Sequence, residues 1–249
     1  MENGSVNNTK RAFWIMLLGA VNLILYLFRN SVISKLIGLT GLNGLYSQCI
    51  ASVLVVVIAA CMIRRGNAHE YGLTRGEYKG NLKYVIPMLF LGVVNIPYVI
   101  LGTSSGIPFV VALILVACVG IMEELIFRGY IFRAIELRFG ENKAVIFSSI
   151  IFGLIHLLNL VFYKGVMPVS SVLLQVFYAA MIGLMFAVLR TKVKSIYPGM
   201  LIHALLDLLC VVFTGDLFIY DVIGSLVCCV VGAVYYIIYR KHHSEQYSE

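Results

Sequence analysis

Long apolar runs recur along the whole sequence, and they constrain its fold more than any other feature. Each run is close to the roughly 20 residues that an α-helix needs to cross the hydrocarbon core of a membrane. Of the 249 residues, 61% are hydrophobic and only 12% are charged, which excludes both a soluble globular domain and a disordered chain. The sequence therefore predicts an all-α polytopic integral membrane protein with about eight transmembrane helices, at residues 12–28, 45–63, 84–101, 107–127, 144–162, 172–189, 196–213 and 217–239.

Lysine and arginine are distributed unevenly between the connections of these predicted helices. Cytoplasmic loops of membrane proteins carry an excess of both residues. With a cytoplasmic N-terminus, all but three of the 19 basic residues fall on the cytoplasmic side, the exceptions being Arg29, Lys35 and Lys164. This bias predicts that both termini are cytoplasmic. The formal net charge of +7 suits a face lying against anionic lipid. Because no basic tract has interleaved aromatic residues, we expect no nucleic-acid partner.

Five ionisable residues lie inside the predicted spans. They are Glu123 and Glu124 in the fourth span, His156 in the fifth, and His203 and Asp207 in the seventh. A charged side chain in the middle of the bilayer costs roughly 2.5–3.5 kcal/mol on insertion scales, and such residues mark functional sites by default. The alternative is a structural set of interhelical hydrogen bonds. Five such groups on three helices favour a functional site.

Helical spacing separates these residues by role. Glu124 and Arg128 are four residues apart, so they share a helix face and can form an ion pair. Glu123 is turned by about 100° from Glu124 and stays free for chemistry. His203 and Asp207 are also four residues apart and present their side chains to a common point. A free carboxylate and imidazoles from separate helices suit the activation of water, with Glu as general base and neutral His as a metal ligand or an orienting group.

Three motifs resemble those of a known family. Residues 123–129 (EELIFRG) resemble an EExxxR motif, residues 152–156 (FGLIH) an FxxxH motif, and residues 203–207 (HALLD) an HxxxN/D motif. In this order and on successive predicted helices, they resemble the CAAX prenyl protease and bacteriocin-processing enzymes, or abortive-infection family, of intramembrane endopeptidases. The resemblance implies a four-helix catalytic core at residues 105–215. Two segments lie outside this core. Residues 1–104 contain three predicted helices and a polar cytoplasmic loop at 64–83, and residues 216–249 contain the last helix and a cytoplasmic tail.

The resemblance also implies roles for the ionisable residues of the first two motifs. Glu123 would activate the attacking water together with His156, and Glu124 would hold Arg128. In the predicted topology Glu123 lies within about one turn of the cytoplasmic end of its helix. We therefore expect a cavity that opens to the cytoplasm.

The third motif leaves the question of a metal open. By resemblance, His203 and Asp207 would bind the developing oxyanion or complete a metal site, because the family is described both as metalloproteases and as metal-free, glutamate-dependent enzymes. Glu123, His156 and His203 would supply the three protein ligands, with one open position, that catalytic zinc requires. Prenyl-protein proteases tend to carry Asn where this chain has Asp207, which favours a substrate that is not prenylated.

The sequence thus predicts a protease whose partners are the lipid bilayer and a membrane-associated peptide or protein precursor. We expect it in the cell membrane, specifically the plasma membrane of a bacterium. One alternative is a non-catalytic membrane scaffold or bacteriocin-immunity protein of the same family. Another is a proton- or ion-coupled transporter, in which the buried Glu, His and Asp residues would form a relay.

Overall fold

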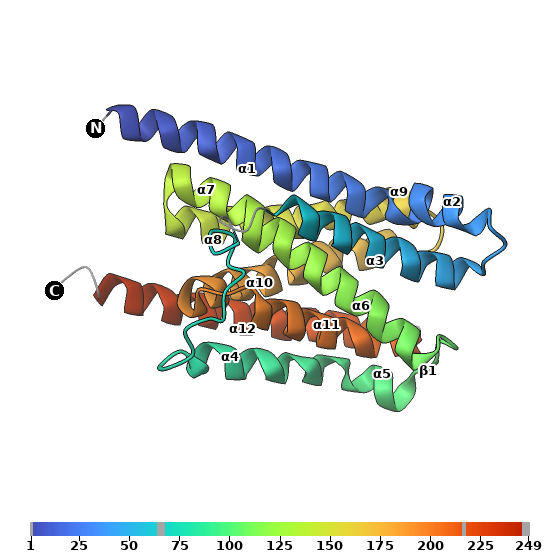
Figure 1. The fold of residues 1–249 in the computed structure, drawn as a ribbon. Coiled ribbons are helices and arrows are strands. Elements are labelled where there is room, and N and C mark those ends of the chain that lie inside the picture. Colours follow the sequence, from blue (N-terminus) through green and yellow to red (C-terminus); the bar gives the residue numbers. More distant parts are fainter. Residues whose placement is uncertain (1, 64–67, 216–217, 246–249) are drawn as a thin grey trace.

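The computed structural model is a bundle of helices that run back and forth along one direction (Figure 1). It describes residues 2–63, 68–215 and 218–245. A two-stranded antiparallel ribbon pairs Thr103 with Thr214. The elements in chain order are α1 (Glu2–Phe28), η1 (Arg29–Ile33), α2 (Ser34–Gly38), α3 (Gly44–Met62), α4 (Leu82–Leu89), η3 (Phe90–Asn95), α5 (Ile96–Leu101), β1 (Thr103–Ser104), α6 (Phe109–Glu124), η4 (Leu125–Ile131), α7 (Phe132–Phe139), α8 (Glu141–Ile155), η5 (His156–Leu158), α9 (Asn159–Phe162), α10 (Val169–Val193), α11 (Tyr197–Val212), β2 (Phe213–Thr214) and α12 (Phe218–Glu245).

The all-α, multi-pass architecture predicted from the sequence is confirmed. Within the described residues, seven helical segments are long and apolar enough to cross a membrane. The seventh predicted span is α11, which has only 16 residues. It still crosses the bundle, because Ile196 at its start is hydrogen-bonded to Gly72 and β2 at its end pairs with β1 at the opposite end. With this pass, the N- and C-terminal ends of the chain lie at the same end of the bundle (Figure 1).

The third predicted span, residues 84–101, is not one regular α-helix. The segment consists of α4, the 3₁₀ segment η3 and α5, and Pro97 lies in the first turn of α5. Proline has no backbone N–H to continue the α-helical hydrogen bonds, so the turn before it cannot follow the regular pattern. The 3₁₀ segment takes the place of that turn. A second proline of this segment, Pro87, lies inside α4.

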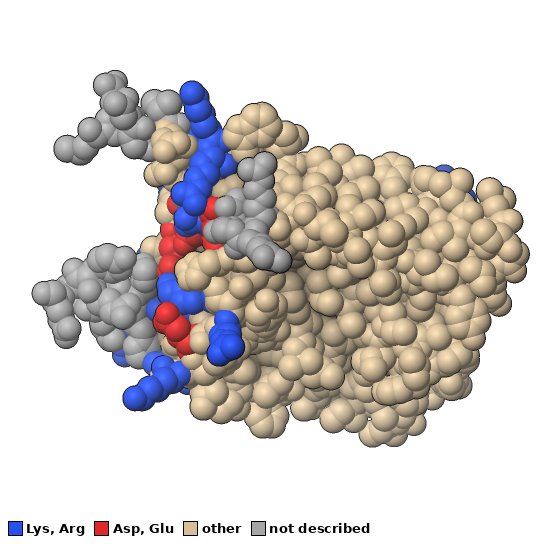
Figure 2. Space-filling model, viewed as in Figure 1, with Lys and Arg blue, Asp and Glu red and all other residues tan. Residues whose placement is uncertain are grey.

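Charged side chains gather at the end of the bundle that holds both termini (Figure 2). Glu70 forms ion pairs there with Arg11 (2.8 Å) and Arg133 (3.1 Å), and Arg133 also pairs with Glu136 (2.8 Å). We call these four residues the ion-paired layer. It ties α1 and α7 to the connection between α3 and α4, and it marks the basic end of the molecule.

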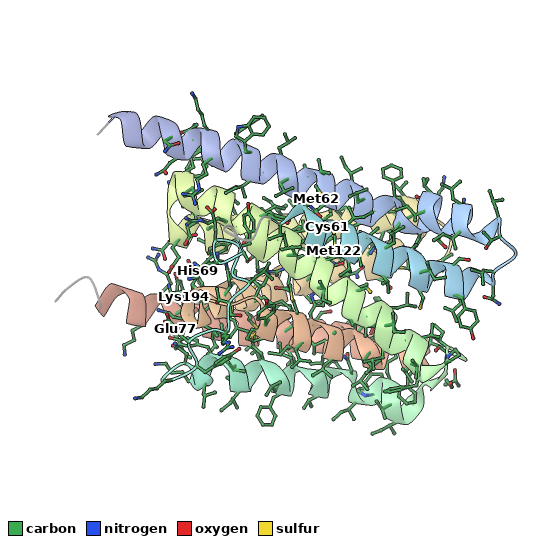
Figure 3. The ribbon with its side chains drawn as sticks, viewed as in Figure 1. Cys61, Met62, His69, Glu77, Met122 and Lys194 are labelled. Carbon is green, nitrogen blue, oxygen red and sulfur yellow. The ribbon has the colours of Figure 1, made fainter. Side chains whose placement is uncertain are left out.

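The predicted polar loop folds onto the turn between α10 and α11. Residues 64–67 lie outside the described part of the chain, but residues 68–81 make several hydrogen bonds to this turn. Thr74 donates to the carbonyl of Lys194 (2.6 Å) and accepts from the Ser195 hydroxyl (2.7 Å). The backbone N–H of Glu77 donates to the carbonyl of Val193 (2.7 Å). Figure 3 labels Glu77 and Lys194 at this junction. The loop therefore covers the basic end of the bundle over α10 and α11.

Candidate active site

The helix that carries Glu123 continues far beyond the apolar run expected to contain it. α6, η4 and α7 form one helical segment, Phe109–Phe139, of 31 residues. The prediction that Glu123 lies within a turn of its helix end is therefore wrong. Arg133, in the ion-paired layer, is ten residues further along, which places Glu123 roughly 15 Å away from that layer. Met122, the preceding residue, lies well inside the bundle in Figure 3.

Glu124 and Arg128 form the ion pair that their spacing predicts. Arg128 Nη1 lies 3.0 Å from Glu124 Oε1, and the two side chains are 0% and 1% exposed. The guanidinium of Arg128 lies over the rings of Phe152 (4.2 Å to the centroid) and Phe186 (5.3 Å). Cations are attracted to aromatic faces, so the rings favour the buried charge without donating a hydrogen bond. The pair is thus enclosed by apolar groups from α8 and α10.

His203 lies at the centre of the cluster. Its Nδ1 is 3.2 Å from Glu124 Oε1, while its Nε2 is 3.6 Å from Glu123 Oε2 and 3.7 Å from Asp207 Oδ2. The imidazole stacks on the ring of Phe186, with centroids 5.5 Å apart. His203 and Asp207 therefore meet as the four-residue spacing predicts, and two carboxylates of α6 join them. One imidazole is placed among three carboxylates.

Exposure of the side chains increases across this cluster. Arg128 and Glu124 are completely enclosed, His203 is 10% exposed, Glu123 14% and Asp207 39%. Asp207 lies one turn beyond His203 on α11, and α11 begins at the loop-covered basic end. The cluster thus becomes more accessible away from the basic end. The expected opening of a cavity toward the cytoplasm stays a prediction.

His156 contacts the Phe152 ring. Its Nδ1 is 2.8 Å from the carbonyl oxygen of Phe152, and the two rings meet edge-on with centroids 5.2 Å apart. Because a carbonyl only accepts hydrogen bonds, this Nδ1 carries a proton and Nε2 keeps a lone pair in the neutral ring. The Phe152 ring also contacts His203, with centroids 5.9 Å apart. The structure thus brings His156 to the edge of the cluster, without a direct contact to Glu123 among its described interactions.

The predicted zinc ligands do not fit a metal site as they are placed. Within the described ranges, no three or more His, Cys, Asp or Glu side chains are arranged to hold a metal ion. Both ring nitrogens of His203 face carboxylates, and Nδ1 of His156 is bound to a backbone carbonyl. The ligand set of Glu123, His156 and His203 remains a prediction, which metal analysis of the purified protein tests.

Two contributions to the cluster were not predicted. The hydroxyl of Tyr26, in α1, donates a hydrogen bond of 2.5 Å to Glu123 Oε1. From α10, Phe186 stacks on His203 and Gly183 leaves room for Arg128. Tyr26 is 97 residues from Glu123, so no local spacing connects them. Gly183 and Phe186 lie in an ordinary apolar run, where a small residue and an aromatic one give no functional signal.

We expect Gly183→Ala to lower thermal stability. A Cβ at this position would lie 2.9 Å from Arg128 Nη2 and 2.9 Å from Phe152 Cδ1, closer than real Cβ contacts. Overpacking of this kind typically costs about 1–3 kcal/mol. The measurement is the apparent melting temperature in detergent. Gly92→Ala is the matched control, because no atom from another part of the described chain lies within 4 Å of its Cβ position. Equal melting temperatures for the two variants would refute this packing argument.

The fold and the cluster define an all-α, multi-pass membrane protein with a buried acid–base site made by α6, η4, α8 and α11. Residues 105–209 match the type II CAAX prenyl endopeptidase Rce1-like family. This match confirms the resemblance to the CAAX protease family over residues 105–209. No curated protein matches the chain. The matched segment contains all three motifs but not α1.

Proposed function

We propose that this chain is an intramembrane endopeptidase that hydrolyses a peptide bond of a membrane-associated peptide or protein precursor. The observation that carries the proposal is the position of Glu123. Its carboxylate lies between a buried tyrosine hydroxyl and His203, next to an ion pair that neutralises the neighbouring Glu124. A partly accessible carboxylate held beside an imidazole is the group expected of a general base acting on water. The family match supports the same class of reaction.

In the proposed reaction Glu123 removes a proton from a water molecule, and the water oxygen attacks the carbonyl carbon of the substrate. The lone pair on Nε2 of His156 helps to orient this water. Attack gives a tetrahedral intermediate with a negatively charged oxygen, to which His203 donates a hydrogen bond. The proton held by Glu123 then passes to the amide nitrogen, and the C–N bond breaks. The products are a carboxylate and an amine, and the enzyme returns to its starting state.

The other members of the cluster prepare this geometry. Glu124, neutralised by Arg128, orients the imidazole of His203 through Nδ1, so that Nε2 faces Glu123 and Asp207. The distance of roughly 15 Å from the ion-paired layer requires that the substrate backbone reach into the bundle. A peptide or precursor already associated with the membrane meets this requirement. We assign the basic end to the cytoplasm of the cell that holds the protein in its membrane.

The test compares cells that carry the native chain with cells that carry Glu123→Gln. Glutamine keeps the shape of the side chain but cannot take a proton from water. We expect a longer precursor of a membrane-associated peptide or protein to accumulate only with Glu123→Gln, measured by mass spectrometry of terminal sequences. Glu77→Gln is the matched control, because it makes the same chemical change on an exposed loop and should process the precursor normally.

Identical terminal sequences in native and Glu123→Gln cells would refute the protease. If deletion of the whole chain still had a phenotype, the chain would be assigned as a membrane scaffold or immunity protein instead of a protease. Proton-driven flux into vesicles that contain the purified chain would instead indicate a transporter.

A further inference from the structure

The buried face of α1 packs against the helix that carries Glu123. Ile15, Asn22 and Tyr26 are buried on this helix, and Gly19 lies between them at the same helical spacing. A Cβ on Gly19 would lie 3.0 Å from Cβ of Tyr130, so α1 packs closely against η4 at this point. Residues three and four apart share one face of an α-helix. Tyr26 therefore faces the same partner helix as Gly19.

The two helices meet in an antiparallel register that extends to the active site. Tyr26 is seven residues after Gly19, and Glu123 is seven residues before Tyr130. Because α1 and the α6–η4 segment run in opposite directions, the contact between Gly19 and Tyr130 places Tyr26 beside Glu123. The hydrogen bond of 2.5 Å from the Tyr26 hydroxyl to Glu123 Oε1 is thus a product of packing along both helices.

The ring of Tyr26 is itself held in place by Arg29. The Arg29 guanidinium lies over the ring, 4.0 Å from its centroid. Its Nη1 also donates a hydrogen bond of 2.9 Å to the carbonyl of Tyr26. A cation over the face and a packed helix on one side limit the rotation of the ring. The hydroxyl therefore has a fixed direction, toward Glu123.

We infer that Tyr26 is a positioning residue for the general base, an inference that rests on the proposed protease function. Its hydrogen bond occupies Oε1 of Glu123, so Oε2, which lies 3.6 Å from His203 Nε2, is the oxygen that takes the proton from water. Without the hydroxyl, the carboxylate can rotate and present either oxygen. Tyr26 thereby extends the active site to α1, outside the segment that matches the protease family.

The test measures steady-state kinetics of full-length Tyr26→Phe in lipid vesicles. The substrate is the synthetic form of the precursor that accumulates with Glu123→Gln. We expect kcat to fall about 10- to 100-fold, the range for loss of a hydrogen bond to a charged group, while KM stays within about twofold. Tyr235→Phe is the matched control, because it removes a hydroxyl that donates to the Tyr84 carbonyl (2.6 Å) elsewhere in the bundle. It should keep the native kcat.

A second measurement tests the contact without any substrate. In the full chain with its six native cysteines replaced by alanine, Tyr26→Cys and Glu123→Cys should be joined by a short bifunctional thiol reagent. Ile24→Cys with Glu123→Cys should not be joined, because Ile24 is 55% exposed on the outer face of α1.

The outcomes separate this inference from the proposed function. Absence of the Tyr26–Glu123 cross-link overturns the inference. A native kcat in Tyr26→Phe also overturns it. In that case, loss of processing in Glu123→Gln would still support the proposed protease function. If Glu123→Gln leaves all termini unchanged, the proposed function fails and the positioning role fails with it, whatever the cross-link shows of the packing.

Discussion

Arg128→Met is expected to destabilise the protein by about 3–5 kcal/mol, the cost of breaking a buried ion pair from one side. Methionine fills a similar space between Phe152 and Phe186 but leaves the carboxylate of Glu124, which is 1% exposed, without its cation. The measurement is the melting temperature in detergent, together with the amount of protein in membranes. Arg138→Met, at an exposed position of α7, is the control and should melt like the native chain.

A double variant identifies the source of this loss. Arg128→Met combined with Glu124→Gln removes both charges, so no uncompensated carboxylate remains buried. We expect it to recover a large part of the melting temperature, because replacement of both partners costs far less than removal of one. It should not recover hydrolysis, since the Glu124 carboxylate no longer orients His203. A double variant as unstable as Arg128→Met would show that the pair contributes through shape and not through charge.

His203→Phe is expected to lower kcat by about 10²- to 10⁴-fold, the usual contribution of a positioned proton donor or acceptor. Phenylalanine keeps the ring that stacks on Phe186 but removes both nitrogens that face the carboxylates. Initial rates with the synthetic precursor measure the effect. Leu205→Phe introduces the same ring on a face of α11 where Leu205 is 47% exposed, and it should keep native rates. An active His203→Phe would remove His203 from the proposed reaction.

The positions of the membrane-spanning helices could be predicted from the sequence, because each helix depends on local composition. An apolar run of suitable length forms a helix wherever it lies in the chain, since backbone groups in lipid must be satisfied within their own segment. The pairing of Glu124 with Arg128, and of His203 with Asp207, follows from four-residue spacing for the same local reason. These features need no knowledge of which helices are neighbours.

The depth of the site could not be predicted in this way. The run expected to end at residue 127 stops being apolar at Arg128 and Arg133, which suggested a cytoplasmic loop. Both residues remain in the helix because each forms an ion pair. Arg128 pairs with Glu124, one turn earlier, and Arg133 pairs with Glu70, in a loop distant in the sequence. The contact of Tyr26 with Glu123 depends in the same way on the packing of two helices. Such partners are fixed only by the three-dimensional arrangement.

The π-helical segment η4, Leu125–Ile131, has a consequence for the phase of the helix that contains it. Its wider turns hold one more residue than α-helical turns would, so α7 is rotated by about 100° relative to a regular continuation of α6. Glu123 and Glu124 thus follow one helical phase and Arg133 follows another. Deletion of a single residue from η4 would hardly shorten the span, yet it would turn either the carboxylates away from His203 or Arg133 away from Glu70. Related sequences therefore need to be compared in two separate registers, one before and one after this segment.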